Sequence, residues 1–124
     1  MSTASSTVSR SVSSRRSSGA NAGLSLVSWS DGLQPWLRPY AEALVGHGRG
    51  VTVTSVFRSW TDQLRLWHTR ERNPFPVAPP GYSYHQYGRA FDVIGPSSEL
   101  AWLGRVWQSW GGTWSTSDPI HFQA

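Results

Sequence analysis

The stretch SYHQYGRAFDV, Ser83 to Val93, carries a histidine, a glycine and an aspartate in one short run. His85 precedes Gly88, which permits a tight backbone path, and Asp92 lies among the apolar residues of RAFDVIG, which predict a strand. A charged carboxylate in such a strand is costly to bury unless it is paired or binds a cation. The stretch is therefore either a half-buried strand that happens to contain a histidine, or half of a metal site.

A second acid and histidine lie near the C-terminus in SDPIHFQ, where Asp118 precedes His121 by three positions. Two neutral imidazoles and one carboxylate can bind zinc and leave a fourth position open for water, as in catalytic sites. The remaining acid can then accept a proton from that water. The chain has no cysteine, so any metal must be held by His, Asp or Glu. Spacing alone does not separate this interpretation from ordinary caps and surface groups, which is what we expect of His47 and His68.

The order of helix-like and strand-like segments predicts an α+β domain with a small, mostly antiparallel sheet and flanking helices. An apolar face of Leu100, Leu103, Val106, Trp107 and Trp110 marks the last helix. In chain order, we expect a helix over 36–45, a strand over 51–58 and a helix that follows an N-cap at Ser59. An irregular proline-rich loop over 71–83 comes next, and a strand over 89–95 follows it. Ser97 or Ser98 is expected to cap a helix that runs to about Trp110, and short strands are expected over 113–114 and 120–123.

Composition divides the chain of 124 residues into a tail and one domain. Residues 1–22 are a Ser- and Arg-rich, low-complexity segment for which disorder is expected, and residues 23–124 form the folded domain. The tail holds three of the eleven basic residues, so the domain has eight against seven acidic ones and is nearly neutral. Nucleic-acid binding is therefore not expected, and no run is apolar enough for a signal peptide or a membrane span.

Three motifs in this order resemble one known family. Ser83-x-His85-x-x-Gly88-x-Ala90-x-Asp92 is similar to the signature of the zinc D-alanyl-D-alanine carboxypeptidase and L-alanyl-D-glutamate endopeptidase family, which includes many bacteriophage endolysins. WGGTWSTSDPIHFQ resembles the C-terminal element of that family, and TSVFRSWTDQLRLW resembles the segment ahead of its signature. The resemblance runs from about residue 33 to 123 and implies the small α+β fold of Hedgehog and DD-peptidase-like domains.

The resemblance also implies residue roles. One zinc ion would be bound by His85, Asp92 and His121, and Asp118 would act as general base and acid. Arg58 would stabilise the oxyanion of the tetrahedral intermediate, although a strand-end salt bridge to Asp62 is the alternative. Ser83 would orient the loop or a ligand by hydrogen bonding. Four further positions have simpler expectations. Gln63 is expected to be structural, and Tyr84, Tyr87 and Trp114 are expected to pack in the core, with lining of the cleft as the alternative.

The implied substrate is the peptide stem of bacterial peptidoglycan, and the WGG and Asp-x-x-His elements look closer to the endopeptidase branch. We expect no export signal, since no apolar run has signal-peptide length, and no cell-wall-binding module after Ala124. These features favour a phage lysin that resides in the host cytoplasm before lysis or in the virion. Gln123 departs from the Glu that many relatives have there. The alternative is a phage structural or docking protein that uses the peptidase fold, with residues 1–22 contacting a virion partner.

Overall fold

The computed structural model describes residues 28–124, so the predictions for the tail and for the domain boundary at residue 23 lie outside the described residues. Within 28–124, no helix has the length and apolar character needed to cross a membrane. The elements are η2 (Trp29–Gly32), α1 (Arg38–His47), β2 (Thr52–Ser55), α2 (Trp60–His68), η3 (Arg70–Arg72), η4 (Tyr84–Tyr87), β3 (Ala90–Ile94), α3 (Ser97–Ser109), β4 (Thr113–Ser115) and β5 (Asp118–Gln123).

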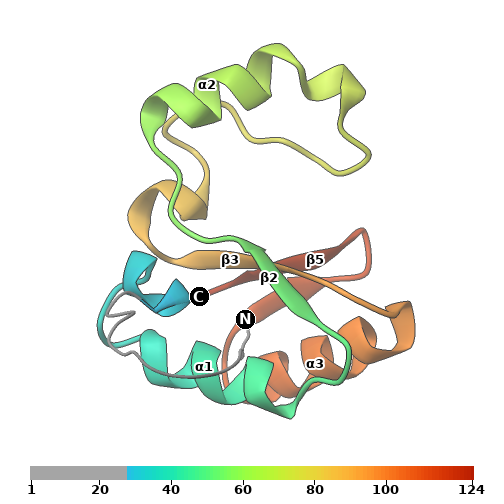
Figure 1. The fold of residues 1–124 in the computed structure, drawn as a ribbon. Helices are drawn as coiled ribbons and strands as arrows, with labels where there is room; N and C mark the ends of the chain where they lie inside the picture. The colour runs from blue at the N-terminus through green and yellow to red at the C-terminus, as the bar shows by residue number, and fades with distance from the viewer. Residues whose placement is uncertain (1–27) are drawn as a thin grey trace.

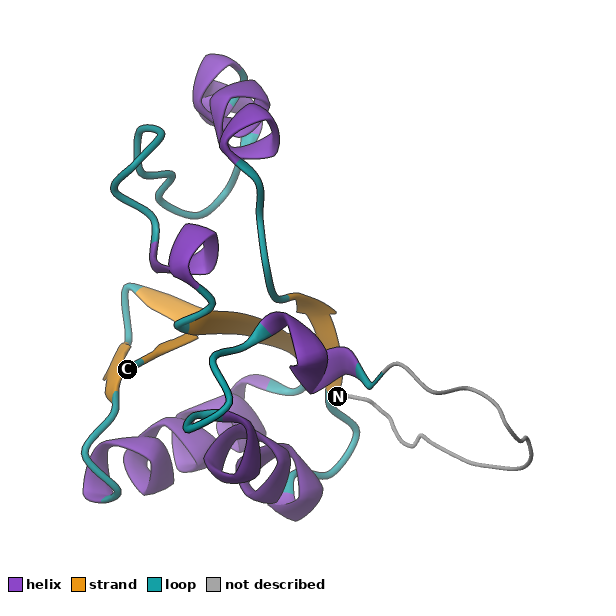
Figure 2. Ribbon diagram, turned by 90° about the vertical axis from the view of Figure 1, so that its left-hand side faces the viewer, coloured by secondary structure: helices purple, strands orange, loops and turns teal. Residues whose placement is uncertain are grey.

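The four strands form one sheet in the order β2-β3-β5-β4, and every neighbouring pair is antiparallel. Helices α1 and α3 lie together under one face of this sheet, whereas α2 stands on the opposite side (Figure 1). The same two layers are visible after a quarter turn (Figure 2). The predicted α+β class with a small antiparallel sheet is confirmed.

The core lies between the sheet and the pair α1 and α3. Phe91 on β3 is paired with Phe122 on β5, and their rings stack with centroids 5.4 Å apart. Trp107 of α3 meets both rings edge-on, and all three side chains are buried. Large aromatic areas removed from water compensate for the short strands of this small domain.

Helix α2 and the loop after it, here called the α2 unit (residues 59–82), pack in a different way. Ser59 caps the helix, as predicted, because its side chain accepts a hydrogen bond from the Asp62 backbone N–H at 3.1 Å. Gln63 is the one buried residue of this helix, and Trp60 is largely exposed. The α2 unit therefore contributes little apolar burial to the fold.

Two details of the predicted last helix are wrong. The N-cap of α3 is Pro96, and no side chain caps the helix, so Ser97 and Ser98 lie inside its first turn. Proline suits this position because its ring restricts the backbone angle φ to values close to the −58° observed here. Trp110 lies one residue beyond the helix and is 42% exposed, so it does not belong to the buried face.

Candidate metal centre

A row of polar side chains crosses the face of the sheet that α1 and α3 leave open. Asp92 on β3 pairs directly with Ser55 of β2 on one side and with His121 of β5 on the other. Directly paired residues of neighbouring strands share a face, while the adjacent Phe91 and Phe122 point into the core. Strand register thus places two of the three predicted metal ligands next to each other.

His85 reaches this row from η4. The Ser83 side chain accepts a hydrogen bond from the His85 backbone N–H at 3.3 Å and caps the short helix. Gly88 ends it with a left-handed φ of 66°, and a Cβ there would lie 3.0 Å from the Gly32 carbonyl oxygen. Only glycine fits both conditions, so the turn holds the His85 side chain buried at 2% exposure.

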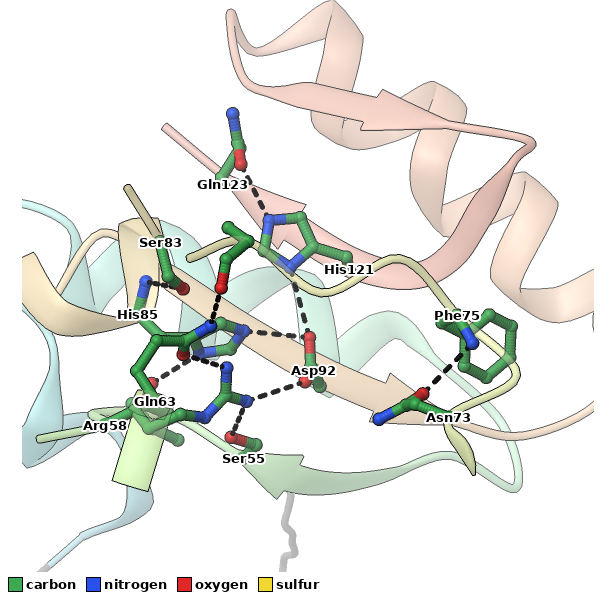
Figure 3. A network of polar contacts seen from close by, with 12 residues as sticks. Ser55, Arg58, Gln63, Asn73, Phe75, Ser83, His85, Asp92, His121 and Gln123 are labelled. Carbon is green, nitrogen blue, oxygen red and sulfur yellow. Dashed lines mark hydrogen bonds and ion pairs between the residues drawn. The ribbon is translucent and has the colours of Figure 1, made fainter. Parts of the chain in front are cut away.

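The three side chains converge on one point (Figure 3). Asp92 Oδ1 lies 3.1 Å from His85 Nε2 and 3.2 Å from His121 Nδ1. One ligand atom from each of the three residues lies within 4.8 Å of the others, a spacing that suits a single metal ion. The structure therefore brings together the three residues that the resemblance implies as ligands.

The hydrogen bonds on the far side of each ring fix its protons. His85 Nδ1 lies 2.6 Å from the Val56 carbonyl oxygen, which only accepts, so Nδ1 carries the hydrogen. His121 Nε2 donates in the same way to Gln123 Oε1 at 2.7 Å. When both rings are neutral, His85 Nε2 and His121 Nδ1 therefore point lone pairs at the carboxylate. Three acceptors that face one another need a metal ion or a proton between them, so these residues fit a metal ion.

Electrostatics in the metal-free protein agree with this geometry. Burial alone would raise the pKa of Asp92, but hydrogen bonds from His121 and His85 lower it well below its usual range. Burial alone would lower the pKa of His121, yet its hydrogen bonds to Asp92 and Gln123 and the nearby carboxylates raise it. A proton on His121 can thus supply the positive charge that Asp92 requires when no metal is bound.

Asp118 lies at the edge of the same cleft. Among residues 28–124, its Oδ1 is the one buried side-chain nitrogen or oxygen without a hydrogen-bond partner. Burial raises its pKa, and the charge of Asp92 adds to the effect. The β4–β5 pairing is irregular, since Thr113 pairs with Gln123 but Ser115 pairs with Asp118. This break in the strand alternation lets Asp118 line the cleft together with His121, three residues away.

Arg58 also points into the site. Its guanidinium donates to Ser55 Oγ and to Gln63 Oε1, both at 2.9 Å, and lies 3.5 Å from Asp92 Oδ2. Burial lowers the pKa of Arg58, and the charge of Asp92 opposes that shift. The salt bridge to Asp62 is absent from the described residues, because that carboxylate pairs with Arg65 at 2.8 Å.

The other predicted residues divide between cleft, core and surface. Ser83 and Tyr84 line a cleft of about 400 Å³. The same cleft is lined by the candidate ligands and catalytic residues His85, Asp92, His121, Asp118 and Arg58. Trp114 packs in the core, and its indole N–H donates to the Pro119 carbonyl at 2.8 Å, beside Asp118. His47 and His68 are exposed and lie outside the cleft.

Sequence reasoning missed three groups that contact the site. Ser55 and the Val56 carbonyl hold Arg58 and His85, and Gln123 holds His121. Gln63, expected to be structural, links Arg58 to the Ala78 carbonyl, to which its amide donates at 2.7 Å. The position of Arg58 at a strand end, shortly before Gln63 on a capped helix, was a sequence signal that could have indicated their contact. The contact of Ser55 with Arg58 could be found only once the strand register was known.

Comparisons with known proteins agree with the fold. The family model of VanY, the D-alanyl-D-alanine carboxypeptidases, matches residues 36–114. No curated protein sequence matches the chain. Solved structures share the fold: the LD-carboxypeptidase LdcB has a TM-score of 0.57 at 24% identity, covering 74% of this chain and 65% of that one.

Two further structures are similar. The D,D-pentapeptidase VanY from a VanB-type resistance cassette, in complex with Zn(II), has a TM-score of 0.55 at 18% identity and covers 73% of this chain and 71% of that one. DacB from Streptococcus pneumoniae has a TM-score of 0.51 at 24% identity, with coverages of 70% and 61%. The chain thus spans roughly two thirds of the length of these proteins. Because the family model covers well over half of the sequence, the chain belongs to the VanY family of D-alanyl-D-alanine carboxypeptidases.

Proposed function

We propose that this protein is a zinc-dependent peptidase that hydrolyses an amide bond in the peptide stem of bacterial peptidoglycan. The observation that carries the proposal is the convergence of His85 Nε2, His121 Nδ1 and Asp92 Oδ1, three acceptors that need a cation. Membership of a carboxypeptidase family and the Zn(II) bound to a similar structure support zinc and a peptide substrate.

His85, Asp92 and His121 would hold the ion. When bound, zinc polarises a carbonyl and lowers the pKa of water. Asp118 would accept the proton of the attacking water and later deliver it to the leaving amine. Its raised pKa and its buried oxygen without a partner suit this role, because a base works best when its pKa approaches the working pH.

Arg58 would bind the oxygen of the scissile carbonyl as negative charge develops on it. Ser55 and Gln63 hold its guanidinium in one orientation, so little reorganisation accompanies the reaction. The ion pair with Asp92 is long at 3.5 Å, which leaves the guanidinium available to a substrate oxygen.

Metal content and hydrolysis test this proposal together. We expect about one zinc ion per chain in the wild type and in the exposed control His68→Ala, and loss of zinc from His121→Ala. Asp118→Ala should keep its zinc and lose hydrolysis of peptidoglycan by about 10²–10⁴-fold. Hydrolysis that persists in the presence of a strong chelator would exclude the zinc mechanism. Zinc-loaded protein that binds the wall without cutting it would support a docking role instead.

The bond and the setting are finer parts of the proposal. The sequence resemblance favours an L-alanyl-D-glutamate endopeptidase over a D-alanyl-D-alanine carboxypeptidase, acting on the wall as a phage endolysin or a virion-borne lysin. Mass spectrometry of digested peptidoglycan distinguishes the two bonds, because only the endopeptidase releases the stem from its first alanine. Loss of turbidity of whole cells after external addition tests the lytic role.

A further inference from the structure

A second pocket adjoins the metal cleft and has no part in the chemistry described above. It is lined by Gly81, Tyr82, Tyr84, Tyr87 and Arg89, and its volume is about 400 Å³. Tyr82 and Tyr84 line both this tyrosine pocket and the metal cleft. A ligand that lies across these two rings would therefore occupy both hollows at once.

The walls of the tyrosine pocket are exposed but held in place. Tyr82, Tyr84 and Tyr87 are 76%, 38% and 54% exposed. The Tyr87 hydroxyl donates to the Gly81 carbonyl at 2.7 Å, which fixes the ring across the pocket. Three exposed aromatic rings around one hollow offer flat apolar faces to a ligand.

Arg89 supplies the polar group of this pocket. Its guanidinium carbon lies 5.1 Å from the centroid of the Tyr84 ring, and its Nε donates to the Ala124 backbone oxygen at 2.7 Å. No carboxylate side chain within 28–124 pairs with it. Its remaining N–H groups are therefore available to a neutral acceptor such as a hydroxyl or an amide carbonyl.

This combination matches the chemistry of a sugar ring. A pyranose presents a flat face of weakly positive C–H groups, which pack on the negative face of an aromatic ring. Its hydroxyl and acetamide groups accept hydrogen bonds from a guanidinium and a phenol. A single arginine already bound to a backbone oxygen and a ring is a poor site for an anion. The Gly81 N–H and carbonyl already bond to Gln86 and Tyr87, so they are not available to a peptide strand.

We propose that the tyrosine pocket binds an N-acetylated amino sugar of the glycan strand next to the stem peptide under attack. The inference rests on the proposed peptidoglycan substrate and sharpens it. Tyr84 directly precedes His85 in η4, so the sugar would lie close to the candidate metal. That proximity favours cleavage at the glycan-proximal end of the stem.

The test compares two substrates of the zinc-loaded wild type: a stem peptide linked to its disaccharide, and the same peptide without sugar. We expect kcat/KM to be about tenfold higher for the linked peptide, as one or two aromatic contacts provide. Tyr87→Ala and Tyr82→Ala should remove this preference. Tyr40→Ala, a matched control on α1 with 55% exposure, should keep it. Equal kcat/KM for the two substrates in the wild type, or a preference for the bare peptide, would overturn the proposal.

A binding measurement separates this proposal from the proposed function. The peptide-free disaccharide is titrated into the Asp118→Ala protein while tyrosine resonances are followed by NMR. Shifts confined to the pocket tyrosines, and lost in Asp118→Ala/Tyr87→Ala, support the sugar site even where neither peptide is hydrolysed. Absence of shifts at millimolar disaccharide overturns it, even where the zinc peptidase activity is confirmed.

Discussion

The two sides of the sheet are built on different principles. Below the sheet, Phe91, Phe122 and Trp107 pack with α1 and α3 in a core that excludes water. Above it, the helix of the α2 unit has one buried residue, Gln63, and the unit is held largely by hydrogen bonds. The candidate metal centre lies where the two sides meet. Packing below fixes Asp92 and His121, while polar contacts above fix Arg58, so stability and activity should respond differently to changes on the two sides.

The largest effect on stability should come from the core. Phe91→Ala removes a fully buried ring and leaves a cavity, so the free energy of unfolding should fall by about 3–5 kcal/mol. Phe75→Ala, in the half-buried loop of the α2 unit, should cost less than about 1.5 kcal/mol. Urea denaturation of the two variants measures the difference. Equal losses would mean that the α2 unit is packed as tightly as the core.

A smaller effect on stability, but a clear one on activity, is expected at Gln63. Gln63→Ala removes the hydrogen bonds to Arg58 and Ala78, which should cost about 1–3 kcal/mol. Hydrolysis should fall by about 10–100-fold because Arg58 loses its orientation. The control is Gln108→Ala on α3, where an exposed glutamine donates to the Trp114 carbonyl. If both variants retain wild-type kcat/KM, Gln63 does not position Arg58.

The smallest effect should be an increase in stability. Burial raises the pKa of Asp118, so its ionised form costs stability in the folded, metal-free protein at neutral pH. Asp118→Asn should therefore raise the free energy of unfolding by about 0.5–1 kcal/mol, a figure reduced for the partial exposure of the carboxylate. The gain should shrink as the pH falls through the raised pKa and disappear well below about 4, the ordinary pKa of Asp, because Asp118 is then protonated in both states. Thermal unfolding of both chelated proteins at several pH values measures it, and a gain independent of pH would contradict this account.

Several elements of the fold were predictable because their signals are local. The cap at Ser59, the strand around Asp92 and the glycine turn at Gly88 each depend on a few neighbouring residues. Spacing and resemblance also selected His85, Asp92 and His121 as one group, although their role as metal ligands stays a prediction. Asp118 was chosen on the same grounds.

What sequence reasoning missed depends on distant contacts. Alternation along 51–58 places Ser55 on the same face as Val53, whereas the structure pairs it with Asp92. The hydrogen bond between Gln123 and His121 depends on the path of β5, which residue types do not reveal. Trp110 was assigned to a buried helix face that ends one turn earlier, at Trp107. Register, strand irregularity and helix ends are decided by tertiary packing, which a pattern of residue types does not encode.

The irregular pairing of β2 has a consequence for how this protein tolerates change. Val53 pairs with Val93 but Ser55 pairs with Asp92, so Thr54 is an extra residue that bends and twists the strand. Beyond that bend, the Val56 carbonyl and the Arg58 N–H both reach His85. The number of residues in this strand thus matters more than their kind. Many side chains can replace Thr54, but its deletion would straighten the strand and withdraw both contacts from the histidine at once.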